Sequence, residues 1–136
     1  MKRGDIYYIS RRDTIGAETM KARPAVIISN NALNETSEVI EVAYLTTQPK
    51  KDLPTHVVIR ATGRPSTVLC EHIDHISTLL VGDYCGTCTA EEMRAIDAAL
   101  LASLGIREKK NPKSQKAPRH LWACIFLTGL YSDSTS

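Results

Sequence analysis

The chain has 136 residues, the length of one domain, and a domain of this size buries roughly two thirds of the surface that its unfolded chain exposes. Its hydrophobic fraction of 43% and charged fraction of 24% exclude a wholly disordered or wholly membrane-embedded chain. Residues 107–136 hold six Lys/Arg and two acids, whereas residues 1–106 hold eleven Lys/Arg and thirteen acids, so an argument for nucleic-acid binding must rest on this tail or on local patches.

Short β-branched segments between turn residues predict a mainly β domain. A polar loop over residues 10–22 separates the first two strands, and a second one covers residues 46–52. Long ordered loops in compact domains are more often functional than incidental, and closely spaced short strands favour a small barrel or a coiled sheet. The strands are expected at 6–9, 25–29, 39–45, 57–59, 66–70 and 75–80, with an Asn-rich turn at 30–34.

One helix is strongly marked, at about 89–104. Thr89-Ala-Glu-Glu92 is a capping box, and Gly105 ends the pattern. Apolar residues recur between them at helical spacing, namely Met93, Ile96, Leu100 and Leu104.

The remaining features concern the tail, the N-terminus and the cysteines. Residues 107–136 are expected to form a basic linker with a short apolar extension, outside a domain of residues 1–106; the linker would either be solvated or strengthen RNA association. Residues 1–12 hold no apolar run of a secretory signal, so a cytoplasmic location is expected. The cysteines are too unevenly spaced for a disulfide framework, and reduced thiols are expected at Cys70, Cys85, Cys88 and Cys124.

The segment Lys21-Ala-Arg-Pro-Ala-Val-Ile-Ile-Ser-Asn30 places a cation and a proline directly before a predicted buried strand. Pro24 fixes its own φ and restricts Arg23 to an extended conformation, so the guanidinium is held on a stiff backbone at the strand entrance. Such a position suits an anion-binding group, although a surface arginine paired with a carboxylate would give the same pattern.

Six segments in order resemble the toxins of the MazF/PemK type: Lys2–Tyr8, Lys21–Asn30, Leu45–Gln48, Leu53–Val57, Val68–Glu71, and Thr89–Met93 with Leu104-Gly105. The resemblance implies an SH3-like small β-barrel (MazF/PemK/CcdB-like) with a C-terminal helix, in a homodimeric toxin of a type II toxin–antitoxin system. It further implies a cytoplasmic mRNA interferase that cuts single-stranded mRNA at specific sequences without a metal or cofactor. A cognate antitoxin would neutralise it.

The resemblance also places site residues. It assigns the catalytic pair to Arg23 and Thr46, and it implicates Glu71, which follows the cysteine of the central strand. Residues next to the pair are expected to contact RNA, namely Lys21, Thr47 and Gln48. The first loop departs from its relatives: Gly16-Ala-Glu-Thr-Met20 replaces their Gly-Ser-Glu-Gln and keeps only the Glu, Glu18, so base preference is expected to differ.

RNA cleavage by its own ribose requires removal of the 2′-hydroxyl proton, stabilisation of the phosphorane and protonation of the departing 5′-oxygen. Arg23 suits the second task, because a guanidinium stays charged and offers a fork to two phosphate oxygens. The Thr46 hydroxyl suits positioning, although a strand-end turn residue would look the same. The products would carry a 2′,3′-cyclic phosphate and a 5′-hydroxyl. The general base stays open among Glu18, Glu71, His56 and His72.

Two other readings stand beside the nuclease. The first is a non-catalytic SH3-like barrel that binds nucleic acid or protein. The second is redox or zinc chemistry at Cys85-Gly-Thr-Cys88, with His72, His75 or Cys70 as further ligands. No second pair stands at zinc-finger spacing, so two small strand side chains are the preferred interpretation.

Overall fold

The computed structural model describes residues 1–10 and 22–107. Apart from Arg107, all of these residues belong to one unit, Met1–Ile106. The predictions for Glu18, Lys21 and the loop around them, and for the tail beyond Arg107, lie outside the described residues.

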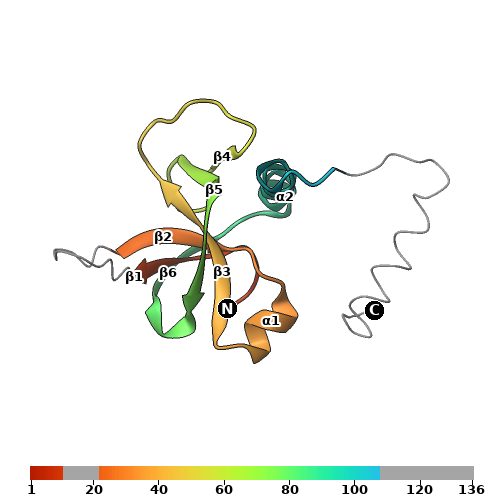
Figure 1. Ribbon diagram of the computed structural model, residues 1–136. Helices are drawn as coiled ribbons and strands as arrows, with labels where there is room; N and C mark the ends of the chain where they lie inside the picture. The colour runs from red at the N-terminus through yellow and green to blue at the C-terminus, as the bar shows by residue number, and fades with distance from the viewer. Residues whose placement is uncertain (11–21, 108–136) are drawn as a thin grey trace, which may run out of the picture. The chain divides into compact units, whose positions relative to one another are not determined.

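Six strands form a single antiparallel sheet in the order β4-β5-β3-β2-β1-β6 (Figure 1). The predicted mainly β domain with a helix at its C-terminal end is confirmed. The elements are β1 (Asp5–Ser10), β2 (Ala22–Ile27), α1 (Asn31–Thr36), β3 (Val39–Thr46), β4 (His56–Ile59), β5 (Ser66–Ser77), the 3-10 helix η1 (Thr78–Leu80), β6 (Val81–Thr87) and α2 (Ala90–Leu104).

Arg23 lies inside β2 rather than at its entrance, so that detail of the sequence prediction is wrong. It pairs with Ile9 of β1, and Pro24 pairs with Tyr8. The ladder to β3 begins only at Ala25. A proline is tolerated here because, among the residues that the structure describes, this part of β2 pairs with β1 and not with β3.

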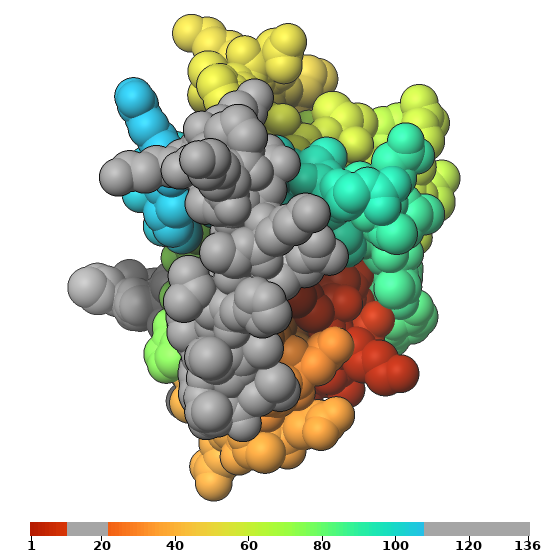
Figure 2. Space-filling model, turned by 90° about the vertical axis from the view of Figure 1, so that its right-hand side faces the viewer, coloured from red at the N-terminus to blue at the C-terminus, as the bar shows by residue number. Residues whose placement is uncertain are grey.

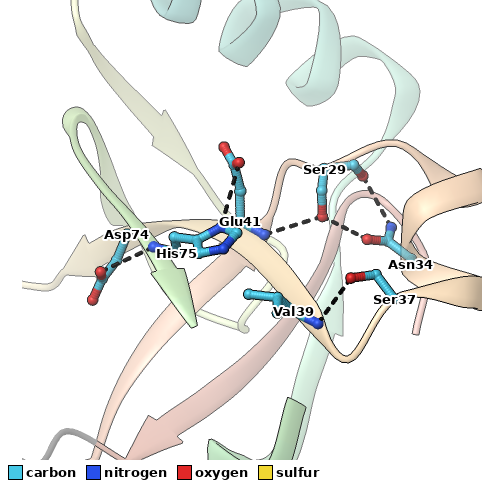
Figure 3. A network of polar contacts seen from close by, with 7 residues as sticks. All are labelled: Ser29, Asn34, Ser37, Val39, Glu41, Asp74 and His75. Atoms are coloured by element: carbon cyan, nitrogen blue, oxygen red, sulfur yellow. Dashed lines mark hydrogen bonds and ion pairs between the residues drawn. The ribbon is translucent and has the colours of Figure 1, made fainter. Parts of the chain in front are cut away.

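The Asn-rich stretch begins the short helix α1 instead of forming only a turn. The Asn30 side chain caps the helix by accepting a hydrogen bond from the Leu33 N–H at 2.9 Å. Asn34 is buried, and its amide donates to the Ser29 carbonyl at 2.9 Å (Figure 3). These side-chain bonds satisfy backbone groups that a bare turn would leave to water.

The two strands expected at 66–70 and 75–80 are one long strand, β5, followed by η1. The register between β5 and β3 shifts between the pairs Ala43↔Ile73 and Leu45↔Val68. β5 therefore has more residues than β3 between these two pairs. A bulge of this kind bends the strand. The bend lets the first half of β5 pair with β4 as well, as in His56↔Leu69.

Alternation along the strands produces two cores, one on each side of the sheet. We call the first the helix-side core: Ile6, Val26, Ala43, Leu45, Ile59, Val68, Cys70, Cys88, Ile96 and Ala99. We call the second the opposite core: Ile9, Ala25, Ile27, Ile40, Val42, Tyr44 and Ile76.

Helix α2 begins and ends as its sequence predicts. Thr89 and Glu92 form the capping box, and Gly105 ends the helix with a φ of 73°. Ile96 and Ala99 are buried in the helix-side core, but Leu104 is 62% exposed. The last member of the predicted apolar stripe therefore lies outside the core.

The hydrogen-bonded ladder stays open between β4 and β6, although the small-barrel fold class holds. A hydrogen bond nevertheless joins the residue after β4 to helix α2, which follows β6. The Arg60 N–H donates to the Glu92 carboxylate at 2.8 Å. A Cβ on Gly86 of β6 would lie 2.3 Å from the Ala61 carbonyl oxygen. Close packing thus brings the two edges together where hydrogen bonds do not.

The β3–β4 loop and α1 lie at opposite ends of the Met1–Ile106 unit (Figure 2). Within residues 1–10 and 22–107, no helix has the length and apolar character needed to cross a membrane.

Candidate active site

A groove of about 550 Å³ lies where β2 and β3 meet the β3–β4 loop. Three of its lining residues are cations, and none of the described lining residues is an acid. Such a groove suits a polyanion. It is lined by Tyr8, Arg23, Pro24, Leu45, Thr46, Thr47, Gln48, Lys50, Arg64 and Leu69. A smaller hollow of about 220 Å³ shares Tyr8, Pro24, Thr47 and Arg64 with it.

Arg23 is held by its strand and by an aromatic ring. Its backbone pairs with Ile9, and its guanidinium carbon lies 5.0 Å from the centroid of the Tyr44 ring. No ion pair found among the described residues involves Arg23. Within residues 1–10 and 22–107, the partner found for the guanidinium is therefore a ring rather than a carboxylate.

Thr46 is the last residue of β3 and also lines the groove. Its Oγ1 accepts a hydrogen bond from the Gln48 N–H at 3.2 Å. This bond uses a lone pair of the hydroxyl and leaves its hydrogen available for donation. The predicted pair, Arg23 and Thr46, therefore lines one groove, together with Thr47 and Gln48.

Of the remaining predicted acid–base candidates, His56 and Glu71 form a pair. His56 Nε2 lies 2.8 Å from Glu71 Oε2, and Nδ1 lies 2.8 Å from the Lys51 carbonyl oxygen. The His56 side chain is 9% exposed and that of Glu71 is 46% exposed. Since both ring nitrogens face acceptors, the imidazolium form satisfies both contacts.

The pKa values of the pair shift accordingly. The hydrogen bond to Glu71 is the main cause that raises the pKa of His56, followed by the one to the Lys51 carbonyl. Burial raises the pKa of Glu71, but hydrogen bonds from His56, Thr55 and the Glu71 backbone outweigh it and lower that pKa overall. Both shifts favour the ion pair.

The pair stands next to the groove along β5. Leu69 lines the groove and pairs with His56 across the β4–β5 ladder. Since His56 pairs with Leu69 and its ring contacts Glu71, the carboxylate lies close to this groove residue.

His72 takes a different place. Its ring lies 4.9 Å from the Tyr44 ring, centroid to centroid, and His72 is not among the described residues that line the groove. The structure therefore brings His72 to Tyr44 rather than to Thr46.

The three cysteines that the structure describes, Cys70, Cys85 and Cys88, pack as small apolar side chains. Cys88 belongs to the helix-side core, and Cys85 packs against it. Burial raises the pKa of Cys88 to about 12 and that of Cys70 to about 11, which disfavours the reactive thiolate. In the part of the chain that the structure describes, no three His, Cys, Asp or Glu side chains are grouped so that they could hold a metal ion.

The sequence reasoning missed Lys50, Arg64 and Tyr44. Arg64 had a usable signal, because Arg64-Pro65 repeats the Arg-Pro dipeptide of residues 23–24. Lys50 lines the groove from the polar loop of residues 46–52, but no feature of the sequence distinguishes it from the neighbouring Lys51. Nothing near Tyr44 in the sequence indicates a role at the site, since a tyrosine is an ordinary residue in a β-strand.

Known proteins are similar to this chain in sequence and in fold. Residues 2–104 match the family described as PemK-like, MazF-like toxin of type II toxin-antitoxin system. The chain is 35% identical over 111 residues to Endoribonuclease EndoA of Bacillus subtilis (strain 168), which covers 78% of this chain and 96% of that protein.

Two solved structures are similar as well. An endoribonuclease from mycobacterial species has a TM-score of 0.68 and 27% identity, over 80% of this chain and 95% of that one. An endoribonuclease in complex with its cognate antitoxin, also from mycobacterial species, has a TM-score of 0.65 and 29% identity, over 80% of this chain and 99% of that one. The chain therefore belongs to the PemK-like, MazF-like toxin family of type II toxin–antitoxin systems.

Proposed function

We propose that the chain is an endoribonuclease toxin that cleaves single-stranded mRNA at short specific sequences in the groove between Arg23 and Thr46. The observation that carries the proposal is that this groove is cationic and contains both residues of the predicted pair. Family membership and the similarity to an endoribonuclease support it independently.

In the proposed reaction, the ribose 2′-oxygen attacks phosphorus and the bond to the 5′-oxygen breaks. Arg23 donates hydrogen bonds to two non-bridging oxygens, where negative charge grows in the phosphorane. Thr46 donates its hydroxyl hydrogen to the phosphate and keeps the reacting atoms in line. The departing 5′-oxygen takes up a proton from water, so the products are a 2′,3′-cyclic phosphate and a 5′-hydroxyl, and the steps require no cofactor.

Among the described candidates, we favour Glu71 as the acceptor of the 2′-hydroxyl proton and His56 as the residue that holds it. The lowered pKa of Glu71 keeps its carboxylate ionised at neutral pH, although it also weakens the base. His56 has both ring nitrogens committed to acceptors, so it is less suited to take up a proton itself.

The decisive assay incubates the protein with a long RNA in excess chelator and maps the ends of the products. Arg23→Ala should lose cleavage, and so should a substrate with 2′-deoxyribose at the cut site. Arg94→Ala is the matched control, because Arg94 is exposed on α2 and is not among the described groove residues. Undiminished cleavage by Arg23→Ala, or a need for added metal, would contradict the mechanism. Tight binding of RNA that stays intact would favour the non-catalytic barrel instead.

Glu71→Gln tests the proton-transfer step separately. We expect kcat to fall about 10²- to 10⁴-fold, while affinity for the 2′-deoxy substrate changes little. Equal losses in affinity and kcat/KM would assign Glu71 to RNA binding.

We also propose a cognate antitoxin as protein partner, a homodimer as the functional unit, and the cytoplasm as the location. The similar structure solved with its cognate antitoxin supports the first of these. Light scattering on the purified protein tests the dimer, and a mass of one chain at micromolar concentration would reject it. The candidate antitoxin is the protein encoded by the neighbouring gene. Added in an equal molar amount, it should suppress RNA cleavage.

A further inference from the structure

The buried ring of Tyr44 packs against the guanidinium of Arg23. Tyr44 is 0% exposed, and its ring lies 5.0 Å from the Arg23 guanidinium carbon. The two residues lie on neighbouring strands, since Ala25 of β2 pairs with Tyr44 of β3. Arg23 and Ala25 are two residues apart and share one face of their strand, so the guanidinium is directed over the ring.

The ring itself is held at its far end. The Tyr44 hydroxyl donates to Asp74 Oδ2 at 2.7 Å. Figure 3 shows the other contact of this carboxylate, in which Asp74 Oδ1 accepts from the His75 N–H at 2.9 Å. The His72 ring packs against Tyr44 at 4.9 Å between centroids. Burial, a charge-assisted hydrogen bond and a second ring thus fix the plane of the phenol.

An aromatic ring holds a guanidinium in a way that a carboxylate does not. A carboxylate would occupy the donor fork of Arg23 and cancel its charge, so that RNA phosphate would have to compete for it. A ring attracts the flat side of the guanidinium and leaves the in-plane N–H groups free for other acceptors. Arg23 has several rotatable bonds, so an unsupported side chain would lose more entropy on binding phosphate.

We propose that Tyr44 is the positioning residue for Arg23, holding the flat side of the guanidinium so that its N–H fork is presented toward the groove. The inference rests on the proposed function, in which Arg23 contacts the reacting phosphate. Tyr44 does not touch RNA in this arrangement and acts only through Arg23.

The first measurement uses the wild-type protein. The NMR resonance of the Arg23 Nε–H, assigned by its loss in Arg23→Lys, should lie upfield of the other arginines because of the Tyr44 ring current. An Arg23 resonance at the ordinary arginine position would overturn the proposal without any change to the core.

The second measurement compares Tyr44→Phe with Tyr44→Leu. Tyr44→Phe keeps the ring and should stay within about threefold of the wild-type kcat/KM, with the Arg23 shift retained. Tyr44→Leu loses the ring and should lower kcat/KM about tenfold or more, with the shift abolished. Ile40→Ala is the matched control, since Ile40 lies in the same core and strand. It should lose stability without losing kcat/KM at a temperature at which all variants are folded.

The third measurement separates an effect through Arg23 from general damage. Affinity for an RNA with 2′-deoxyribose at the cut site is measured for Tyr44→Leu, Arg23→Ala and the double variant. The double variant should bind no more weakly than Arg23→Ala, because the ring has nothing left to position. Losses that multiply in the double variant, or full wild-type kcat/KM in a folded Tyr44→Leu, would overturn the inference. Undiminished cleavage by Arg23→Ala would instead reject the proposed function itself.

Discussion

His56 and Glu71 form an ion pair in which the 9%-exposed imidazole is joined to a carboxylate that is 46% exposed, at 2.8 Å. The second ring nitrogen of His56 faces the Lys51 carbonyl, so both nitrogens serve as donors in the charged form. This pair joins β4 to β5 beside the groove, and it gives the domain a pH dependence of defined sign.

The pair should stabilise the folded state most between about pH 4.5 and 6.5. The pKa of His56 is raised above 6.5, so its contribution is complete below 6.5 and is lost as the pH rises through the raised value. The pKa of Glu71 is lowered below 4.5, so its contribution is complete above 4.5 and is lost as the pH falls through the lowered value. Because Glu71 is half exposed, the gain should be about 1 kcal/mol or less.

Urea unfolding of the wild type and Glu71→Gln at about pH 5.5 and about pH 9 measures this effect, and the difference in stability should shrink at the higher pH. The His75–Glu41 pair offers the comparison, because its atoms are 3.6 Å apart and its side chains are 69% and 50% exposed. His75→Gln should change stability less at both pH values. A difference that grows with pH for Glu71→Gln would contradict the assigned ionisation.

Thr46 tests whether a hydroxyl hydrogen is needed in the groove. Thr46→Val keeps the shape but removes the hydroxyl, and we expect kcat/KM to fall about 10²-fold. Thr46→Ser keeps the hydroxyl and its bond from the Gln48 N–H, and it should stay within about threefold of the wild type. The measurement is steady-state cleavage of one short RNA. Equal losses in both variants would assign Thr46 to packing.

The cations that the sequence reasoning missed should act through phosphate. Lys50→Ala and Arg64→Ala should each weaken RNA binding and reduce the slope of log K against log salt by about 0.7, the value for one phosphate of a single strand. Binding of the 2′-deoxy substrate at several salt concentrations gives the slope. Arg94→Ala should leave the slope unchanged. An unchanged slope in Arg64→Ala would mean that Arg64 does not contact an RNA phosphate.

Gly86 tests the contact between the open edges of the sheet. A Cβ there would lie 2.3 Å from the Ala61 carbonyl oxygen, so Gly86→Ala must displace backbone and should cost about 2–3 kcal/mol. Gly63→Ala is the matched variant, because Gly63 also has a positive φ, 95°, but no atom within 4 Å of its added Cβ. It should cost about 1 kcal/mol from backbone strain alone. Equal midpoints of urea unfolding for the two variants would mean that the contact at Gly86 can relax.

Local chemistry made several features predictable. The Thr89–Glu92 capping box and Gly105 mark the ends of α2, because caps depend on residues next to each other in sequence. The β-branched runs mark the strands for a similar reason. A turn was the wrong prediction for Asn30–Asn34, because Asn both caps helices and forms turns. The helix is selected by the buried hydrogen bonds between Asn34 and Ser29, which a local pattern does not reveal.

Residues that are neighbours in the chain were enough to predict helix α2, most of the strands, the family resemblance and the expectation that Arg23 and Thr46 belong to one site. The sequence does not predict the bend of β5 that places His56 against Glu71, nor the position of the Tyr44 ring against the Arg23 guanidinium. These partners come from different strands, and strand register and bulges arise from the packing of the whole sheet rather than from nearby residues. The sequence motifs therefore indicate the proposed reacting residues, Arg23 and Thr46, whereas the residues that position them are found only from contacts between strands.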